Sequence, residues 1–523
     1  MGRLLPVFIN LHFEISMKIR NLLFASTFAS AAFAQERPNI VLFLVDDMGW
    51  QDTSVPFFSE PTRWNQIFHT PNMERLAAKG MKFTQAYACP VSSPSRVSLL
   101  TGANVTQHHV TNWTLHKNRP TDSKSDSLLF PGWNFNGMSP VPEIEHSFYA
   151  TPLPRLLKEA GYKTVMVGKA HFGALTTPAE DPLALGFDIN IGGHAAGGPG
   201  SYLGSRSFGK DRPAQEAAIY AIPHLEAYHG QDIFLTEALT REAIKAMEGS
   251  LHAKQPFFLY MSHYAVHTPY EVDSRFYPKY KAMGLEEQEA RYASIVEGMD
   301  KSLGDIMDFL TRKGIEKNTI ILFMSDNGGY TVGVRANTHG GEPKNSPLRG
   351  GKGACFEGGI REPMIVSWEG VTQPGASNSS PVIIEDFFPT ILKMAGIRNQ
   401  KTVQQIDGID FSKALRGQTI NENRSLYFHY PNRWGEKYGD IGVPQSAIRV
   451  GNWKLIYYYE EEKIELYNLA SDISEKENLA GSEACQKVVQ NLARQLSNRL
   501  RSQGSPIPLR RSGGEKARYP DQI

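Results

Sequence analysis

Short apolar segments without polar alternation constrain the fold of this chain more than any other feature of its sequence. They are rich in Val, Ile, Leu and Phe, and such a run is typical of a strand buried on both faces of a sheet. Because segments with helical periodicity lie between them, we predict an α/β fold with helices on both faces of a large, mostly parallel sheet. The predicted strands are residues 39–45, 163–167, 257–261, 319–324 and 364–367, and the predicted helices are residues 154–160, 235–248, 292–310 and 386–395.

The pattern changes near Gly417. Short strands separated by turns are predicted at residues 446–450, 453–459 and 464–468, followed by a polar helix at 483–501 with apolar residues at helical spacing. This is the pattern of a small antiparallel sheet with one helix. We therefore predict three regions: a catalytic domain at 35–417, an α+β subdomain at 418–502, and a loose, basic, Gly/Pro-rich tail at 503–523.

The amino terminus has the pattern of a secretory signal peptide over residues 1–34. Lys18 and Arg20 precede an apolar run at 22–33, and Ala32-Phe33-Ala34 forms a small-x-small cleavage site. Met17 stands directly before the charged residues and is the predicted true start. The apolar run is too short to span a bilayer, so we predict a secreted or periplasmic protein without a membrane span.

The overall composition is that of an ordinary globular protein. Lys and Arg number 55 against 54 Asp and Glu, which gives a formal net charge of +1 and excludes a polybasic nucleic-acid binder. The three cysteines cannot form a disulfide framework. We expect no nucleic-acid partner.

Four predicted strands run directly into polar residues. Because ligands bind at the carboxyl ends of parallel strands, these residues should meet at one edge of the sheet. Carboxylate and amide oxygens at two of the ends suit Ca²⁺ or Mg²⁺ better than zinc, although a single Asp-Asp pair is equally compatible with a helix cap. The strand-end residues are Asp46 and Asp47, Lys169 and His171, His263 and His267, and Asp326 and Asn327.

A second polar segment contains Ser92 at the predicted start of a helix. Pro94 suits the first helical position, Ser92 or Ser93 suits the cap, and Gly102 suits the helix end. Ser92 would then lie where the helix dipole and free N–H groups favour negative charge. On local grounds alone, a simple capping serine is the favoured interpretation of the segment.

The segment around Ser92 resembles the signature of the formylglycine-dependent sulfatases, of the alkaline-phosphatase-like superfamily. The matching pattern is Ser92-x-Pro94-Ser95-Arg96-x-x-x-Leu100-Thr101-Gly102. In that family the first residue, Cys or Ser, is oxidised to formylglycine, and the serine form is typical of bacterial anaerobic-type maturation. Ala103 departs from the pattern, where the family commonly has Arg. Further matching segments are 38–50, 168–173, 260–270, 297–300, 347–353, 357–361, 448–455 and 466–469.

The resemblance implies a fold, a cofactor, a modified residue and a set of roles. One Ca²⁺ would be bound by Asp46, Asp47, Asp326, Asn327 and the modified Ser92 (3-oxoalanine, or formylglycine). Arg96 would stabilise the aldehyde hydrate, and His171 would take the proton that lets sulfate leave. Lys169, His267 and Lys352 would contact the sulfate oxygens, with either His267 or Lys352 protonating the leaving alcohol. A sulfatase-maturing enzyme acting on Ser92 is an implied partner.

The expected substrate is a sulfated carbohydrate of mucin or glycosaminoglycan type, carrying sulfate on galactose or an N-acetylhexosamine. Segments outside the family match supply the candidate sugar contacts. These are the Gly-rich segment 194–204 with His194, Arg335, His339, His429 and Arg433, together with Trp113 and His116. Two alternatives stay open at this stage. One is a phosphodiesterase or phosphonate hydrolase of the same superfamily, and the other is a catalytically silent glycan-binding protein.

Overall fold

The central sheet is built around a fully buried strand, β1 (Asn39–Val45). The computed structural model describes residues 37–130, 132–332, 343–435 and 439–523, and within them nine strands form this sheet in the order β11-β2-β10-β9-β1-β8-β6-β7, with β12 beside β2. The other strands are β2 (Met81–Tyr87), β6 (Lys163–Gly168), β7 (Ile189–Ile191), β8 (Phe257–Ser262), β9 (Thr319–Ser325), β10 (Arg361–Ser367), β11 (Ala376–Asn378) and β12 (Val382–Ile383).

Parallel pairing aligns the carboxyl ends of four central strands. β1 is parallel to both β8 and β9, and Val45 pairs with Ser325 in the last register position. β6 continues the parallel set, with Gly168 beside Ser262 of β8. The predicted strand-end residues therefore come to one edge of the sheet, as the sequence indicated.

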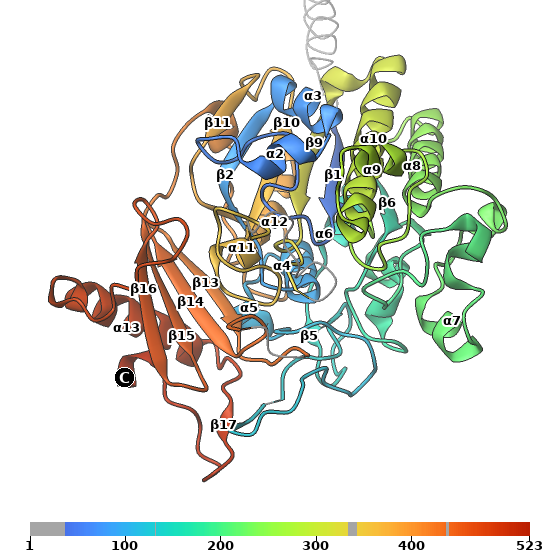
Figure 1. The fold of residues 1–523 in the computed structure, drawn as a ribbon. Helices are drawn as coiled ribbons and strands as arrows, with labels where there is room; N and C mark the ends of the chain where they lie inside the picture. The colour runs from blue at the N-terminus through green and yellow to red at the C-terminus, as the bar shows by residue number, and fades with distance from the viewer. Residues whose placement is uncertain (1–36, 131, 333–342, 436–438) are drawn as a thin grey trace, which may run out of the picture. The chain divides into compact units, whose positions relative to one another are not determined.

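Helices cover both faces of the sheet (Figure 1). Alternate residues of β1 point to two separate cores: Val41 and Phe43 pack with α8 and α10, whereas Ile40 and Leu42 pack with α4, α6 and α12. The predicted α/β fold is confirmed. The helices are α2 (Arg63–Ile67), α3 (Pro71–Lys79), α4 (Ser92–Thr101), α5 (Val105–His108), α6 (Leu153–Glu159), α7 (Ala214–Tyr220), α8 (Leu235–His252), α9 (Tyr277–Ala282), α10 (Glu287–Arg312), α11 (Glu357–Ile360), α12 (Phe387–Met394) and α13 (Gln486–Ser502).

A smaller antiparallel sheet follows, in the order β13-β14-β15-β16. Apolar residues of α13, including Leu496, pack against Ile448 and Leu455 of this sheet. Its strands are β13 (Ser425–Tyr430), β14 (Gln445–Val450), β15 (Trp453–Tyr458) and β16 (Lys463–Asn468), and the remaining short strands of the chain are β3 (Leu128–Leu129), β4 (Met138–Ser139), β5 (Phe148–Tyr149) and β17 (Leu509–Arg510). No helix among the described residues is both apolar enough and long enough to span a bilayer.

The carboxyl-terminal segment differs from the prediction of a loose tail. β17 pairs with β3, far back in the chain. Arg510 and Arg518 both pair with Glu462, and Arg501 of α13 donates to Asp521 at 2.6 Å. Two of the basic residues that suggested a solvated tail, Arg510 and Arg518, instead find an acidic partner in the turn between β15 and β16.

A buried ion cluster joins the antiparallel sheet to the catalytic region. Lys454 of β15 is fully buried and lies 2.9 Å from Glu357 of α11 and 2.8 Å from Glu475. Burial raises the pKa of Glu475 to about 7 although Lys454 opposes the shift. Because a buried carboxylate is costly without its cation, this lysine holds two regions of the chain together.

Replacing the buried lysine is therefore expected to destabilise the whole protein. Lys454→Met removes the buried cation beside Glu475 and leaves Glu357 with Arg361 alone, so it should lower the free energy of unfolding by about 3–5 kcal/mol. The matched control is Lys301→Met, which removes a half-exposed pair with Asp305 and should cost about 0.5 kcal/mol or less. Urea unfolding of the two variants measures both values, and equal effects would contradict the assignment.

Candidate active site

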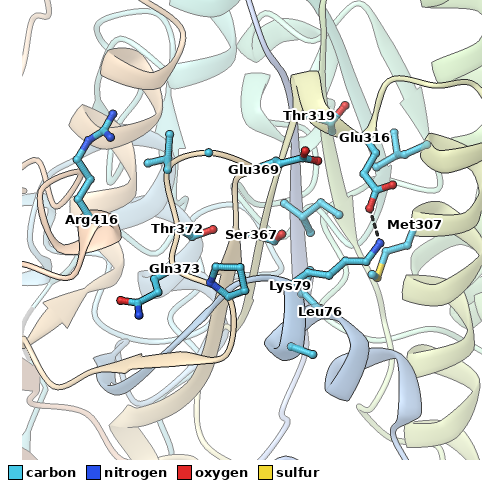
Figure 2. A pocket seen from close by; sticks show the side chains of 16 residues that line it. Leu76, Lys79, Met307, Glu316, Thr319, Ser367, Glu369, Thr372, Gln373 and Arg416 are labelled. Carbon is cyan, nitrogen blue, oxygen red and sulfur yellow. Dashed lines mark hydrogen bonds and ion pairs between the residues drawn. The ribbon is translucent and has the colours of Figure 1, made fainter.

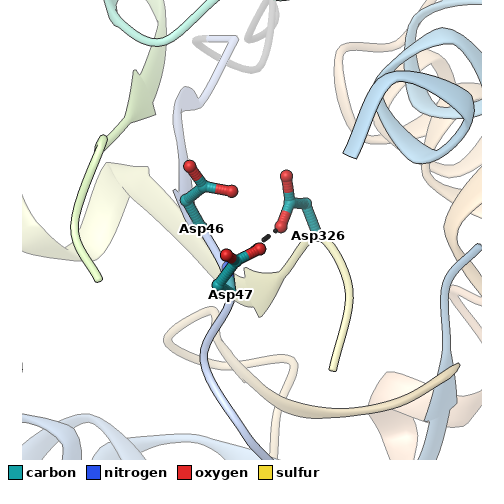
Figure 3. A group of neighbouring side chains, drawn as sticks. All are labelled: Asp46, Asp47 and Asp326. Carbon is teal, nitrogen blue, oxygen red and sulfur yellow. Dashed lines mark hydrogen bonds between the residues drawn. The ribbon is translucent and has the colours of Figure 1, made fainter. Parts of the chain in front are cut away.

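Three carboxylates gather at the carboxyl ends of β1 and β9 (Figure 3). Asp46, Asp47 and Asp326 are buried, and one oxygen from each lies within 4.8 Å of the others. Asp47 has a φ of 61°, a left-handed conformation that aspartate adopts more readily than most residues. In this conformation the backbone N–H of Asp47 donates to Asp326 Oδ1 at 3.3 Å.

Ser92 lies beside this cluster as the first residue of α4. Its Oγ is 3.1 Å from Asp46 Oδ1 and 3.0 Å from Asn327 Oδ1, and Lys169 Nζ donates to it at 3.1 Å. The cap residue is Val91, which offers no side-chain hydrogen bond, and the helix ends at Gly102 with a φ of 68°. The prediction of a capping serine followed by Pro94 at the first position was wrong, since the helix begins two residues earlier.

Three cations balance the three carboxylates. Arg96 lies about one helical turn after Ser92 in α4. Its Nε donates to Asp326 Oδ2 at 2.8 Å, and a terminal nitrogen forms an ion pair with the same oxygen at 2.7 Å. Lys169 Nζ lies 2.7 Å from Asp46, and Lys352 Nζ lies 2.6 Å from Asp47. These side chains are buried, so the charges interact across a poorly screened medium.

The electrostatics of the cluster suit an additional cation. Burial raises the pKa of Asp46 to about 8 even though Lys169 lies beside it. Burial also opposes ionisation of Asp47, yet Lys352 and His267 hold its pKa well below the usual range. The oxygen-only donor set of three carboxylates and the Asn327 amide fits a hard divalent ion rather than zinc.

Two histidines complete the polar residues of the site. His171 has its Nε2 2.9 Å from the Thr114 carbonyl oxygen, and its buried Nδ1 has no hydrogen-bond partner among the described residues. Burial, reinforced by Lys169, holds the pKa of His171 well below its ordinary value. His267 Nδ1 lies 2.8 Å from the Thr268 carbonyl oxygen, and burial and Lys352 lower the pKa of His267 to about 3.

Two consecutive glycines pack against these histidines. A Cβ on Gly197 would lie 2.5 Å from Cε1 of His171, and a Cβ on Gly198 would lie 3.0 Å from Cε1 of His267. Any side chain at Gly197 would therefore displace the imidazole. The Gly-rich segment after His194 therefore packs its backbone closely against the His171 and His267 rings.

A cavity of about 430 Å³ opens above Ser92. It brings together five predicted catalytic residues, Ser92, Lys169, His171, His267 and Lys352. Gly197, Gly198 and Pro199 of the Gly-rich segment 194–204, a predicted sugar contact, also line it. Sequence reasoning did not single out Arg212, Tyr220 and Trp434, and no motif in the sequence marked them.

Most predicted sugar contacts lie elsewhere. His429 is fully buried on β13, with Nδ1 2.7 Å from Ser446 Oγ and Nε2 2.9 Å from the Pro506 carbonyl oxygen, so neither nitrogen is available to a substrate. Arg433 pairs with Glu460 at 2.9 Å. His194 is partly buried, and its ring packs against Tyr264 outside the lining of the cavity. Arg335 and His339 lie outside the described residues, and Trp113 does line the cavity.

A larger cavity of about 590 Å³ lies at the opposite ends of the strands (Figure 2). Thr319, the first residue of β9, lines it, whereas Asp326 follows the last residue of that strand. Lys79 and Glu316 form an ion pair across its rim. None of the charged cluster around Ser92 contributes to it, so volume alone does not identify the active site.

The site and fold define a family. The model of the sulfatase family matches residues 38–397, and the model described as N-sulphoglucosamine sulphohydrolase, C-terminal, matches residues 351–503. The chain therefore belongs to the sulfatase family and is a sulfatase, an enzyme that hydrolyses sulfate esters.

Individual relatives support the same assignment. A sulfatase of Formosa agariphila is 30% identical, with 93% of each chain covered. The N-acetylgalactosamine-6-sulfatase of Mus musculus is 32% identical over 86% of this chain and 78% of its own length. Among solved structures, Ps i-CgsB in complex with k-i-k-neocarrahexaose has a TM-score of 0.69 and 26% identity, covering 89% of this chain and 93% of the other.

Proposed function

We propose that this protein removes sulfate from a sulfated carbohydrate, using a formylglycine formed from Ser92 and one Ca²⁺. The observation that carries the proposal is the position of Ser92. Its Oγ lies within 3.1 Å of Asp46, Asn327 and Lys169, at the start of a helix and in the wall of a cavity. A nucleophile placed there meets both a metal-binding oxygen set and the cations that a sulfate group requires.

The metal site uses residues already in place. Asp46, Asp47, Asp326, Asn327 and the converted Ser92 would hold the ion. When bound, Ca²⁺ supplies positive charge that polarises the sulfate and favours ionisation of a nearby hydroxyl. Arg96 keeps the Asp326 carboxylate oriented through one hydrogen bond from Nε and an ion pair from a terminal nitrogen, and a fixed guanidinium also favours negative charge on the nucleophile.

The nucleophile itself explains why serine alone should not suffice. A sulfate ester of serine is hard to hydrolyse, whereas the hydrate of an aldehyde supplies one hydroxyl to attack sulfur and a second whose deprotonation releases sulfate. We assign that deprotonation to His171. Because the Thr114 carbonyl can only accept, Nε2 carries the hydrogen and Nδ1 is the basic nitrogen.

Three side chains would bind the sulfate oxygens and assist the leaving group. Lys169, His267 and Lys352 all line the cavity beside Ser92. Their positive charge or N–H groups would offset the charge that moves onto the leaving oxygen. His267 and Lys352 are the two candidates to protonate the departing alcohol.

The proposed substrates are galactose or N-acetylhexosamine sulfates of mucin or glycosaminoglycan type. The support comes from the names of two relatives, an N-acetylgalactosamine-6-sulfatase and a structure bound to a neocarrahexaose. We further propose secretion and a maturing enzyme that oxidises Ser92. The signal peptide predicted at 1–34 lies outside the described residues.

Conversion of Ser92 is expected to control all activity. Ser92→Ala should release no sulfate, and a Ser92→Cys form whose formylglycine content is confirmed by peptide mass should be active on a panel of sulfated saccharides. Phosphorylated saccharides in the same panel serve as the control for specificity. Phosphate release without sulfate release would overturn the proposed function and favour a phosphodiesterase or phosphonate hydrolase.

Calcium is expected to stabilise the folded protein as well as support catalysis. At a Ca²⁺ concentration 100 times the Kd, the free energy of unfolding should rise by about 2.7 kcal/mol over that in chelator. Asp47→Asn should abolish this difference, whereas Asp308→Asn, a half-exposed residue paired with Arg75, should keep it. Identical unfolding curves of the wild type with Ca²⁺ and with EGTA would rule out the ion.

Displacing the His171 imidazole should lower kcat without preventing substrate binding. A Cβ at residue 197 meets the imidazole at 2.5 Å, so Gly197→Ala is expected to lower kcat about 100-fold, the usual contribution of a positioned base, with a small change in KM. Gly249→Ala in α8, where a Cβ meets nothing within 4 Å, is the control. An unchanged kcat for Gly197→Ala would argue against His171 as the base.

A further inference from the structure

Two tryptophans line the cavity above Ser92 without a role in the proposed chemistry. Trp113 comes from the loop after α5, and Trp434 from the connection between β13 and β14. An aromatic wall beside the charged residues Lys169 and Lys352 of the same cavity is a means of binding an apolar surface. The inference below rests on the proposed function and names what the pocket holds beyond the sulfate group.

Trp434 is held against the loop that carries Lys352. A Cβ on Gly353 would lie 2.7 Å from the Trp434 ring, so only glycine lets the indole approach this backbone. Lys352 Nζ lies 5.7 Å from the ring centroid, and the Tyr330 ring lies 6.0 Å away. The backbone N–H of Trp434 donates to the Gly442 carbonyl oxygen at 3.1 Å. The backbone N–H of Gly442 in turn donates to the Gly353 carbonyl oxygen at 2.9 Å.

Trp113 is tied equally closely to the catalytic residues. The next residue, Thr114, provides the carbonyl that His171 Nε2 contacts, and its N–H donates to Ser93 Oγ at 3.1 Å. The Trp113 carbonyl oxygen accepts from Thr121 Oγ1 at 2.7 Å. The indole therefore belongs to a loop with fixed geometry relative to both α4 and His171.

One carboxylate links the segments that carry the two tryptophans. Asp122 Oδ1 accepts from Asn432 at 2.6 Å and from Asn112 at 3.5 Å, and its Oδ2 accepts from Trp133 Nε1 at 2.7 Å. The N–H of Ser123 also donates to the Arg433 carbonyl oxygen at 3.0 Å. The loop that carries Trp113 and the connection between β13 and β14 that carries Trp434 are therefore hydrogen-bonded to each other close to both tryptophans.

We propose that Trp113 and Trp434 form the binding surface for the pyranose ring that bears the sulfate, and that Asp122 is the positioning residue for this surface. One face of a pyranose presents C–H groups, whose slight positive charge suits the negative face of an indole. Sulfate oxygens would meet Lys169, His267 and Lys352 while the ring rests on the aromatic wall. The antiparallel sheet contributes Trp434 and so completes the substrate site.

Binding and turnover of saccharides test this surface. Trp434→Ala should raise the Kd of a sulfated monosaccharide about 10-fold or more, measured by calorimetry on the Ser92→Ala protein with N-acetylgalactosamine 6-sulfate and galactose 6-sulfate. Trp113→Ala should give a loss of the same order. Trp434→Phe should recover most of the affinity, and Trp453→Ala, on β15 of the same sheet, should leave it unchanged.

Inorganic sulfate separates the sugar surface from the sulfate-binding cations. Its Kd should be unchanged in both tryptophan variants, and Asp122→Asn should weaken saccharide binding several-fold while also leaving inorganic sulfate binding unchanged. Equal losses for sulfate and saccharide would mean that the tryptophans only maintain the site, and unchanged saccharide affinity in both Ala variants would also overturn the inference. The wild type could release sulfate from simple esters but neither bind nor desulfate a saccharide. That result would contradict the proposed sugar-binding surface and would leave the sulfatase activity supported.

Discussion

Neutralisation of buried carboxylates is the constraint on which the rest of this structure depends. Asp46, Asp47 and Asp326 are brought together only because β1 and β9 are parallel neighbours that end in register. Such a group of charges cannot remain buried without cations, and these come from α4, from the end of β6 and from the Gly-rich loop before α11. The positions of the candidate catalytic residues therefore follow from the packing of the sheet.

The sequence predicted the centre of this arrangement well for a physical reason. A strand buried on both faces is almost entirely apolar, so the first charged residue after it marks its end. Asp46 follows β1 and Asp326 follows β9 in this way. The same signal failed for β2, where Met81 and Phe83 alternate with half-buried polar residues. It also failed for the start of α4, because Val91 provides no capping side chain.

Sugar recognition was harder to predict because it depends on contacts between distant segments. His429 looked available in the sequence, yet Ser446 and the Pro506 carbonyl oxygen satisfy both of its ring nitrogens. Trp434 carried no motif, and its place in the cavity depends on the absence of a side chain at Gly353. Neither fact could be read from the residues themselves, since each follows from how the antiparallel sheet packs on the catalytic domain.

The burial of Ser92 has a consequence for the order of events in the life of the protein. Its side chain is only 2% exposed, and α4 packs its whole length into the core. The maturing enzyme proposed above would need this residue in an extended segment, whereas in the folded chain it lies in α4. Oxidation of Ser92 would then have to precede folding, so a chain that folds before it is oxidised would remain a stable but inactive product.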